Sequence, residues 1–312
     1  MLTWHVLRFP RLILWYRDAS RDQRATAAAA GSLGVGLLES AKLRLFDNGR
    51  GKTLFILGSG QSVNELSDRQ LEVIGRNPSI GINYWFLHSL VPSTYAFESH
   101  PKQYGALSNA QLLARDRLAL RASVQLASES SPRVLHLRPP TGERASLFPL
   151  ADSVLPRTYL YGRANVTART ADSLKSDLKL LVPLARKGFL PPSVLPDNGA
   201  SVVRLIFLAV AQGFRDIVLV GVDLDDRPHF YFSDKYSDYH QDLRLMNPQL
   251  DRPSHETREL LHRPFDTLEF LAALGDVMNA GKAPRLWVGA ASSQLSTALP
   301  MYPWEDAEKL PS

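Results

Sequence analysis

The chain has 312 residues, of which 45% are hydrophobic and 21% are charged, as expected for a folded globular protein rather than a disordered one. It contains no cysteine, which excludes disulfide bonds, thiolate metal sites and a thiol nucleophile, and is consistent with a reducing cytoplasm. The net charge of +5 equals the excess within residues 1–52, which carry nine Lys and Arg against four Asp and Glu. The rest of the chain therefore lacks the continuous basic face that binding to nucleic acid requires.

Residues 1–24 mix aromatic and aliphatic side chains with arginines, as a helix lying in a membrane interface does. A helix packed on its own domain would give the same pattern, and both interpretations stay open. No apolar run reaches the roughly 20 residues of a membrane span, and no clear signal-peptide pattern is present. We expect a cytoplasmic protein whose residues 1–24 are a candidate contact with the inner face of the cytoplasmic membrane. Residues 1–52 form a basic amphipathic extension, with residues 27–36 as a linker or loose helix.

The catalytic domain is expected at residues 53–312, and its first strand is Thr53–Leu57. A helix follows the glycines after this strand, and residues 79–87 and 93–99 are predicted as further strands that end in polar residues. We expect a helix at residues 109–121 and a short strand at 133–139. Residues 139–158 contain several prolines and have no assignment.

The second half of the chain predicts the centre of a parallel sheet. Residues 201–214 form an almost entirely apolar helix closed by Gly213, and the β-branched run "DIVLVGVDL" follows, as in a strand buried on both faces. Residues 266–281 predict an amphipathic helix and residues 285–290 a last strand. The fold class is therefore α/β, with a single doubly wound, mainly parallel, Rossmann-like sheet.

Residues 225–262 are polar, aromatic and basic, with no clear period. That composition is typical of a substrate loop, and we interpret the segment as a small lid that contacts the acceptor.

The turn after the first strand is the first candidate site. Glycines let the backbone approach a ligand closely, and amides at the start of the following helix favour an anion such as phosphate. A tight turn without a ligand would have the same sequence, because the third glycine of a dinucleotide motif and the lysine of a P-loop are both missing. The candidate residues of this turn are Gly58, Ser59, Gly60, Gln61 and Ser62.

Polar residues at the ends of other strands extend this candidate site. Asn83 is a polar residue that we place at the end of the strand begun at residue 79, and Ser99 ends the third predicted strand, where open α/β sheets place ligand contacts. Asp223 and Asp225 follow the central strand. They either bind Mg²⁺ or Mn²⁺ on a nucleotide-sugar diphosphate, or hydrogen-bond loop amides while His229 and Tyr231 reach a phosphate.

Two histidines, His255 and His262, are candidate bases, since imidazole takes a proton from a sugar hydroxyl near neutral pH. Each is equally consistent with an ordinary histidine in a surface loop. The sequence has neither a G-x-S-x-G nor an HExxH motif, which argues against a serine hydrolase and a zincin.

Taken in order, these motifs resemble those of the bacterial CMP-sialic acid-dependent sialyltransferases that act on lipooligosaccharide, over roughly residues 53–300. "GSGQS" stands at the family's G-N-G-P-S, Asn83 at the asparagine of its C-N-Q-F stretch, and Ser99 at an asparagine that closes the third strand. An ungapped match up to "GVD" places Ser201 on the family's donor-binding serine. "DTLEFL" and "LWVGAASSQLSTALP" resemble its later helix and closing strand.

The resemblance implies a GT-A-like, inverting glycosyltransferase with no metal or other cofactor. It would move an acidic sugar, sialic acid or Kdo-like, from a CMP-activated donor to a hydroxyl of a cell-surface glycan in lipopolysaccharide or capsule biosynthesis. Tyr231 coincides with one of two tyrosines that hydrogen-bond the leaving phosphate in that family, and Asp225 stands at the other. His262 is the first choice for the base and His255 the second. Ser59, Gln61, Ser99 and Asp225 depart from the family pattern, which leaves the donor sugar open.

Two other functions remain open from the sequence. A pyrophosphokinase of the hydroxymethylpterin type would share the glycine-rich opening and the acidic strand end, and would require Mg²⁺. A non-catalytic nucleotide-binding protein of envelope glycan assembly would bind CMP without turnover. The sequence does not determine the acceptor, the linkage or whether the chain forms a homo-oligomer.

Overall fold

The structure, a computed structural model, describes residues 10–39, 46, 52–98, 108–127, 132–138, 152–246, 264–281 and 284–308. The strands are β1 (Gly36–Leu37), β2 (Thr53–Leu57), β3 (Ser79–Ile82), β4 (Thr94–Phe97), β5 (Arg133–Leu137), β6 (Thr158–Asn165), β7 (Val194–Asp197), β8 (Asp216–Val220) and β9 (Arg285–Val288). The α-helices are α2 (Pro10–Leu33), α3 (Asp68–Gly75), α4 (Asn109–Leu126), α5 (Ala171–Arg186), α6 (Ser201–Gln212), α7 (Ser237–Met246), α8 (Thr267–Asn279) and α9 (Trp304–Glu308). Short 3₁₀ helices are η1 (Gln61–Glu65), η2 (Asn83–Leu87), η5 (Asp152–Arg157), η6 (Phe230–Phe232), η7 (Asp234–Tyr236) and η8 (Gln294–Thr297).

All nine of these strands belong to one sheet. Its order is β1-β6-β5-β4-β3-β2-β8-β9, with β7 paired to β6. Each of the strand pairs is parallel. The fold is therefore the doubly wound, Rossmann-like α/β fold that the alternation of strands and helices predicts.

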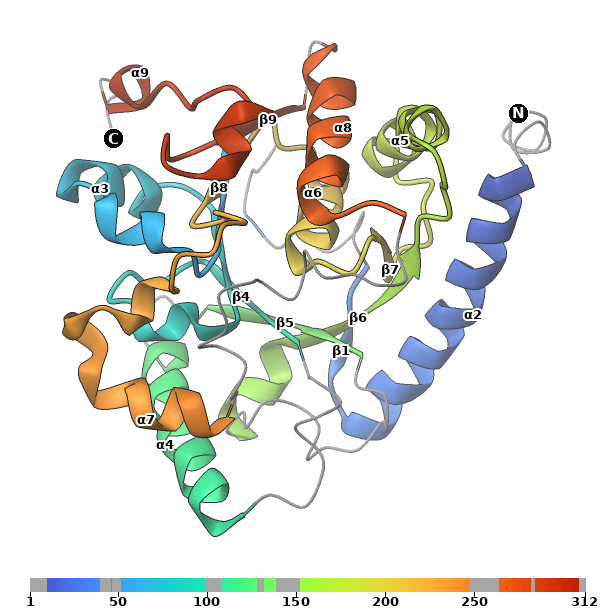
Figure 1. Cartoon of the computed structure of the whole chain (residues 1–312). Helices are drawn as coiled ribbons and strands as arrows, with labels where there is room; N and C mark the ends of the chain where they lie inside the picture. The colour runs from blue at the N-terminus through green and yellow to red at the C-terminus, as the bar shows by residue number, and fades with distance from the viewer. Residues whose placement is uncertain are drawn as a thin grey trace.

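Helices cover both faces of the sheet (Figure 1). One apolar core joins the sheet to α2, α5, α6 and α8, and a second joins its other face to α3, α4 and α7. α6 lies deep in the first core, where every residue from Val202 to Val210 is buried, which explains its almost entirely apolar sequence. β8 is buried along its whole length, as its continuous apolar run predicts.

The order of the strands reverses direction next to β2. From β2 the chain adds β3, β4, β5 and β6 in one direction, and α6 then returns it to β8 on the opposite side of β2. The register pairs Leu57 of β2 with Gly81 of β3 and with Val220 of β8, so the three carboxyl ends lie level. In open α/β sheets this reversal is where ligands bind, outside the carboxyl ends of the strands.

Helix α2 packs on its own domain, which is the second of the two interpretations left open by its sequence. Trp15 is 2% exposed and donates its indole N–H to the Ala164 carbonyl oxygen at 3.0 Å. The large apolar side chains of α2 that face outward are Ile13 and Leu14, which are 39% and 45% exposed. The helix continues to Leu33, so most of residues 27–36 is helical, as in the second of the two alternatives for that segment, a linker or a loose helix. Membrane contact through residues 1–24 stays a prediction.

Residues 225–246 differ from the irregular loop that their composition predicts. They fold into η6, η7 and α7, and Phe230, Tyr231 and Leu243 are buried in the second core. Arg117 of α4 pairs with Asp242 of α7 and ties this segment to the domain. The aromatic residues of the segment are therefore core residues, and the remainder of the predicted lid, residues 247–262, lies outside the described residues. None of the helices described for this chain combines the length and apolarity needed to cross a bilayer.

The packing of α2 can be measured. We expect Trp15→Ala to lower the free energy of unfolding by about 3–5 kcal/mol, because it removes a large buried side chain. Leu14→Ala, on the outer face of the same helix, should change it by less than about 0.5 kcal/mol. Urea denaturation of both variants checks this. Equal effects of the two substitutions would contradict the packing of α2 on the sheet.

Candidate functional site

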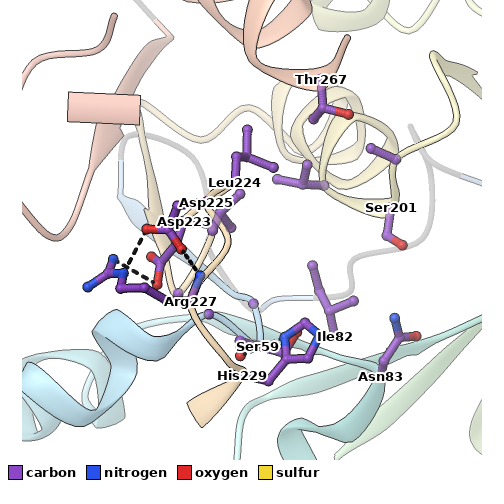
Figure 2. A pocket seen from close by; sticks show the side chains of 16 residues that line it. Ser59, Ile82, Asn83, Ser201, Asp223, Leu224, Asp225, Arg227, His229 and Thr267 are labelled. Carbon is purple, nitrogen blue, oxygen red and sulfur yellow. Dashed lines mark hydrogen bonds and ion pairs between the residues drawn. The ribbon is translucent and has the colours of Figure 1, made fainter. Parts of the chain in front are cut away.

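A pocket lies at the reversal of strand order, between the carboxyl ends of β2, β3 and β8 and the start of α6 (Figure 2). It contains Gly58 from the first turn and Ser201 from the first residue of α6, the two positions that the predicted nucleotide site requires close together. The lining residues are Gly58, Ser59, Gly60, Ile82, Asn83, Ala200, Ser201, Val202, Gly221, Val222, Asp223, Leu224, Asp225, Arg227, His229 and Thr267.

The glycines after β2 are required by the neighbouring turn after β8. A Cβ atom on Gly58 would lie 2.4 Å from the Gly221 carbonyl oxygen, and one on Gly60 would lie 2.5 Å from the carboxylate of Asp223. The amides of Gly58 and Gly60 donate to the Val220 and Gly221 carbonyl oxygens, each at 2.7 Å. The two turns are therefore joined by backbone hydrogen bonds. The glycines are needed for this close packing whether or not a ligand approaches them.

Ser62 does not present its amide to the pocket as an anion site, which corrects the interpretation of the turn. Asp223 accepts the Ser62 amide at Oδ2, at 2.8 Å, and the Ser62 hydroxyl at Oδ1, at 2.5 Å. Burial raises the pKa of Asp223, and the hydrogen bonds from Ser62 together with the charge of Arg227 oppose that shift. The carboxylate thus occupies the place expected for an external anion, which agrees with the alternative in which Asp223 binds loop amides.

Arg227 forms ion pairs with the acidic side chains on this wall of the pocket. Its Nε donates to Asp225 Oδ2 at 2.7 Å, and its Nη2 lies 3.3 Å from Asp223 Oδ2. The guanidinium also donates to Glu65 at 3.0 Å and to the Ser292 carbonyl oxygen at 2.9 Å. Within the described ranges no three His, Asp or Glu side chains converge as metal ligands would.

Asn83 and Ser201 lie on the opposite side of the pocket from the Arg227 cluster (Figure 2). Ser201 begins α6, whose N-cap residue, Ala200, makes no side-chain capping bond. The helix has no acidic residue in its first turn to offset the partial positive charge of its N-terminus, and the Asp197 carboxylate just before the helix is paired with Arg204. This end of α6, rather than η1, is where the pocket favours an anion.

Two strained backbone positions also line the pocket. In the part of the chain that the structure describes, the non-glycine residues with a left-handed backbone are Asn83, at φ 50°, and Leu224, at φ 56°. Such conformations are costly for a bulky residue like leucine and tend to gather at functional sites. The strain coincides with the pocket that the strand order predicts.

His229 lines the pocket, whereas Tyr231 does not. Tyr231 is 1% exposed and stacks on the His229 ring with a centroid separation of 5.1 Å. Burial raises the pKa of Tyr231 well above its usual value, Tyr84 adds to this, and a hydrogen bond with Ser59 opposes it. Tyr231 therefore does not line the pocket as described, whereas the half-buried His229 does, and the contact between Tyr231 and a ligand stays a prediction.

The structure brings most of the predicted residues together and adds two. Arg227 and Thr267 line the pocket although the sequence did not single them out as site residues, and His229, which the sequence placed near a phosphate in one of two alternatives, lines it as well. The available signal was the run of polar side chains directly after the central strand, in "DDRPHF". Gln61 lies in η1 outside the lining set. Ser99, His255 and His262 lie outside the described residues.

Comparison with known proteins adds little to this geometry. No protein-family model matches the chain. No curated protein matches its sequence. Among solved structures it matches the sialyltransferase CstII from Campylobacter jejuni in complex with a substrate analogue, cytidine-5′-monophosphate, at 13% identity and a TM-score of 0.39, over 82% of this chain and 86% of that chain. It also matches a Tyr-to-Phe variant of the sialyltransferase Cst-II in complex with CMP, at 12% identity and a TM-score of 0.45, over 84% and 89% of the two chains.

The contact between the two turns predicts the effect of a single methyl group. Gly58→Ala should lower the free energy of unfolding by about 1–3 kcal/mol, because the new Cβ meets the backbone of the facing turn and either turn must shift. Gly31→Ala is the control, since nothing lies within 4 Å of a Cβ at that helical position. It should raise stability by about 0.5–1 kcal/mol. Thermal unfolding of both variants measures the difference, and a Gly58→Ala protein as stable as the parent chain would argue against the described contact.

Proposed function

We propose that the chain is an inverting glycosyltransferase that moves an acidic sugar from a CMP-activated donor to a hydroxyl of a cell-surface glycan. The observation that carries the proposal is the shared pocket of the Gly58–Gly60 turn, Asn83 and Ser201. These are the positions at which the sequence matches the donor-binding motifs of CMP-dependent sialyltransferases, and the strand order independently selects the same place for a ligand.

The proposed donor binds with its phosphate toward the N-terminus of α6. The uncapped first turn of α6 supplies favourable partial charge, and the Ser201 hydroxyl supplies a hydrogen bond to an anion. Asn83 offers amide hydrogen bonds from the end of β3 to the same ligand. The donor site thus uses one wall of the pocket, while Asp223 and Arg227 maintain the other.

The acid at position 225 is compatible with a phosphate in this arrangement. A carboxylate close to a phosphate would repel it. Asp225, however, is bound to Arg227 through Nε and through the Arg227 amide, the latter at 3.1 Å. The pairing directs the negative charge of Asp225 toward an internal cation and away from the α6 side of the pocket.

In the proposed reaction a histidine takes the proton of the acceptor hydroxyl, and the hydroxyl oxygen attacks the anomeric carbon of the donor. The bond from that carbon to the CMP phosphate oxygen breaks, CMP leaves with the electron pair, and the configuration inverts. We assign the base to His262 first and to His255 second. Tyr231 acts as a positioning residue behind His229 and Ser59. A pocket that excludes water would protect the donor from hydrolysis.

The alternative of a Mg²⁺-dependent pyrophosphokinase has a specific obstacle. Its metal would bind Asp223 and Asp225, yet both carboxylates are engaged by Arg227, and Asp223 is also bound to Ser62. These bonds would have to break before either acid could bind a metal.

A CMP-release assay tests the function. The protein is incubated with CMP-Neu5Ac and with CMP-Kdo, with and without EDTA, and we expect release of CMP from one donor that EDTA leaves unchanged. Ser201→Ala should weaken CMP binding about tenfold, the effect of one lost hydrogen bond to a charged group, ~1.5 kcal/mol. Ser176→Ala, on the exposed surface of α5, is the control and should bind CMP normally. Turnover that stops with EDTA would favour the metal-dependent alternative, and CMP binding without any release would favour the non-catalytic one.

The assignment of the base makes a separate prediction. His262→Ala should abolish CMP release while its CMP affinity stays close to that of the parent chain, because a base acts on the acceptor and contributes little to nucleotide binding. His255→Ala should retain release. Loss of turnover in His255→Ala alone would reverse the two assignments.

A further inference from the structure

Ser59 holds the imidazole of His229 through two oxygen atoms. His229 Nδ1 lies 3.1 Å from the Ser59 hydroxyl oxygen and 3.2 Å from the Ser59 carbonyl oxygen. The Phe230 amide also donates to that carbonyl oxygen, at 3.0 Å, which fixes the start of η6 on the turn after β2. Tyr231 stacks on the ring with an interplanar angle of 27°. His229 is therefore fixed on the glycine turn at the floor of the pocket.

The carbonyl contact decides the tautomer. A carbonyl oxygen can only accept, so Nδ1 must carry the hydrogen in this arrangement, and in the neutral ring the lone pair then lies on Nε2. This excludes Ser59 as a nucleophile activated at Nδ1, since a protonated nitrogen cannot take the serine proton. A contact from the ring to a ligand must use Nε2. In the neutral ring Nε2 accepts hydrogen bonds and repels an anion, whereas in the protonated ring it donates.

The charges around His229 make its protonation state important for an anion. Asp223 and Asp225 line the same pocket, and the guanidinium of Arg227 is shared between them and Glu65. The two tyrosines behind the ring stay neutral near pH 7, because burial raises the pKa of Tyr84 to about 12 and that of Tyr231 well above its usual value. The basic side chains among the lining residues are Arg227 and His229, and Arg227 already serves three carboxylates.

We propose that His229 contacts the phosphate of the ligand through Nε2–H, and that the site takes up one proton when the phosphate binds. The inference rests on the proposed function for the identity of the ligand, CMP, and extends it by adding a protonated histidine to the phosphate contacts proposed for Ser201 and Asn83. His229 is the ligand contact and Ser59 is its positioning residue. The same imidazolium would face the phosphate as CMP leaves in the proposed transfer. Because the site takes up one proton as it binds the phosphate dianion, its affinity for CMP falls as the pH rises.

The experiment measures CMP binding by titration calorimetry at pH 7 and pH 8, in two buffers with different ionisation enthalpies. Between these values the phosphate of CMP is already largely a dianion, since the second pKa of such a group is about 6. An ordinary histidine titrates near pH 6.5, so one linked proton should weaken binding about tenfold over this pH unit. In the parent chain we expect uptake of about three quarters of a proton per CMP at pH 7 and close to one at pH 8. In His229→Asn the side-chain amide can still donate to Ser59 but cannot become a cation, so we expect no uptake and pH-independent binding.

His240→Asn is the matched control, because His240 bonds to the Tyr231 carbonyl oxygen at 3.0 Å and is not among the pocket-lining residues. It should keep the proton uptake of the parent chain. Uptake that persists in His229→Asn, or is missing in the parent chain, overturns the inference. Equal affinities for cytidine and CMP would overturn it too, while leaving a nucleoside site intact.

A binding measurement with inorganic phosphate distinguishes failure of this inference from failure of the proposed function. If the chain does not bind CMP but binds phosphate with one proton, and His229→Asn abolishes that proton uptake, the nucleotide proposal fails and the anion contact stands. If neither ligand binds the parent chain, both fail.

Discussion

The contact between two backbone turns determines the geometry of the candidate site. β2 and β8 end level with each other, and the turns that follow them approach so closely that Gly58 has no room for a side chain beside the Gly221 carbonyl oxygen. This contact places the Gly58–Gly60 turn and the Asp223–Asp225 segment in one pocket, although some 160 residues separate them in the chain. The reversal of strand order opens the sheet at the same point, so the pocket follows from the topology before any side-chain chemistry is considered.

The two walls of the pocket have different chemical characters. On one wall Asp223 accepts hydrogen bonds from the Ser62 amide and hydroxyl, and Arg227 forms ion pairs with Asp223 and Asp225. The polar groups of this wall are therefore bonded to one another. On the other wall α6 begins without a side-chain cap beside Ser201 and Asn83. An anionic ligand is therefore favoured at α6, and His229 lies on the turn between the two walls.

The sequence predicts the fold well where burial is encoded in a local pattern. The strand at 53–57, the buried strand at 216–220 and the apolar helix ending at Gly213 are all found where expected, because residues buried on every side must be apolar throughout. The packing of the segment at 225–246 could not be predicted from its sequence, since its aromatic side chains pack against η2 and α4, which are distant in sequence.

The difference between local patterns and contacts distant in sequence also explains which features of the site could be predicted. Local sequence identifies the glycine turn and Asn83, because each lies at the end of a strand, whereas Ser201 was identified only by the resemblance of the motifs to those of CMP-dependent sialyltransferases. Local sequence cannot show that Asp223 would satisfy Ser62, or that His229 would stand in front of Tyr231, since both depend on how β2 and β8 meet. The sequence pattern predicts which side chains lie at the carboxyl ends of the strands, where ligands bind. It does not predict which of these side chains are bonded to each other.

The Arg227 guanidinium connects η1, the turn after β8 and the segment before η8 through Glu65, Asp225 and the Ser292 carbonyl oxygen. The Arg227 guanidinium thus connects three separate segments of the chain by hydrogen bonds. No one of them can move alone without breaking a charge-assisted hydrogen bond. A change of ligand preference would then evolve most readily on the opposite side of the pocket, at Asn83, Ser201 and Thr267, where a changed side chain leaves the bonds of Arg227 intact.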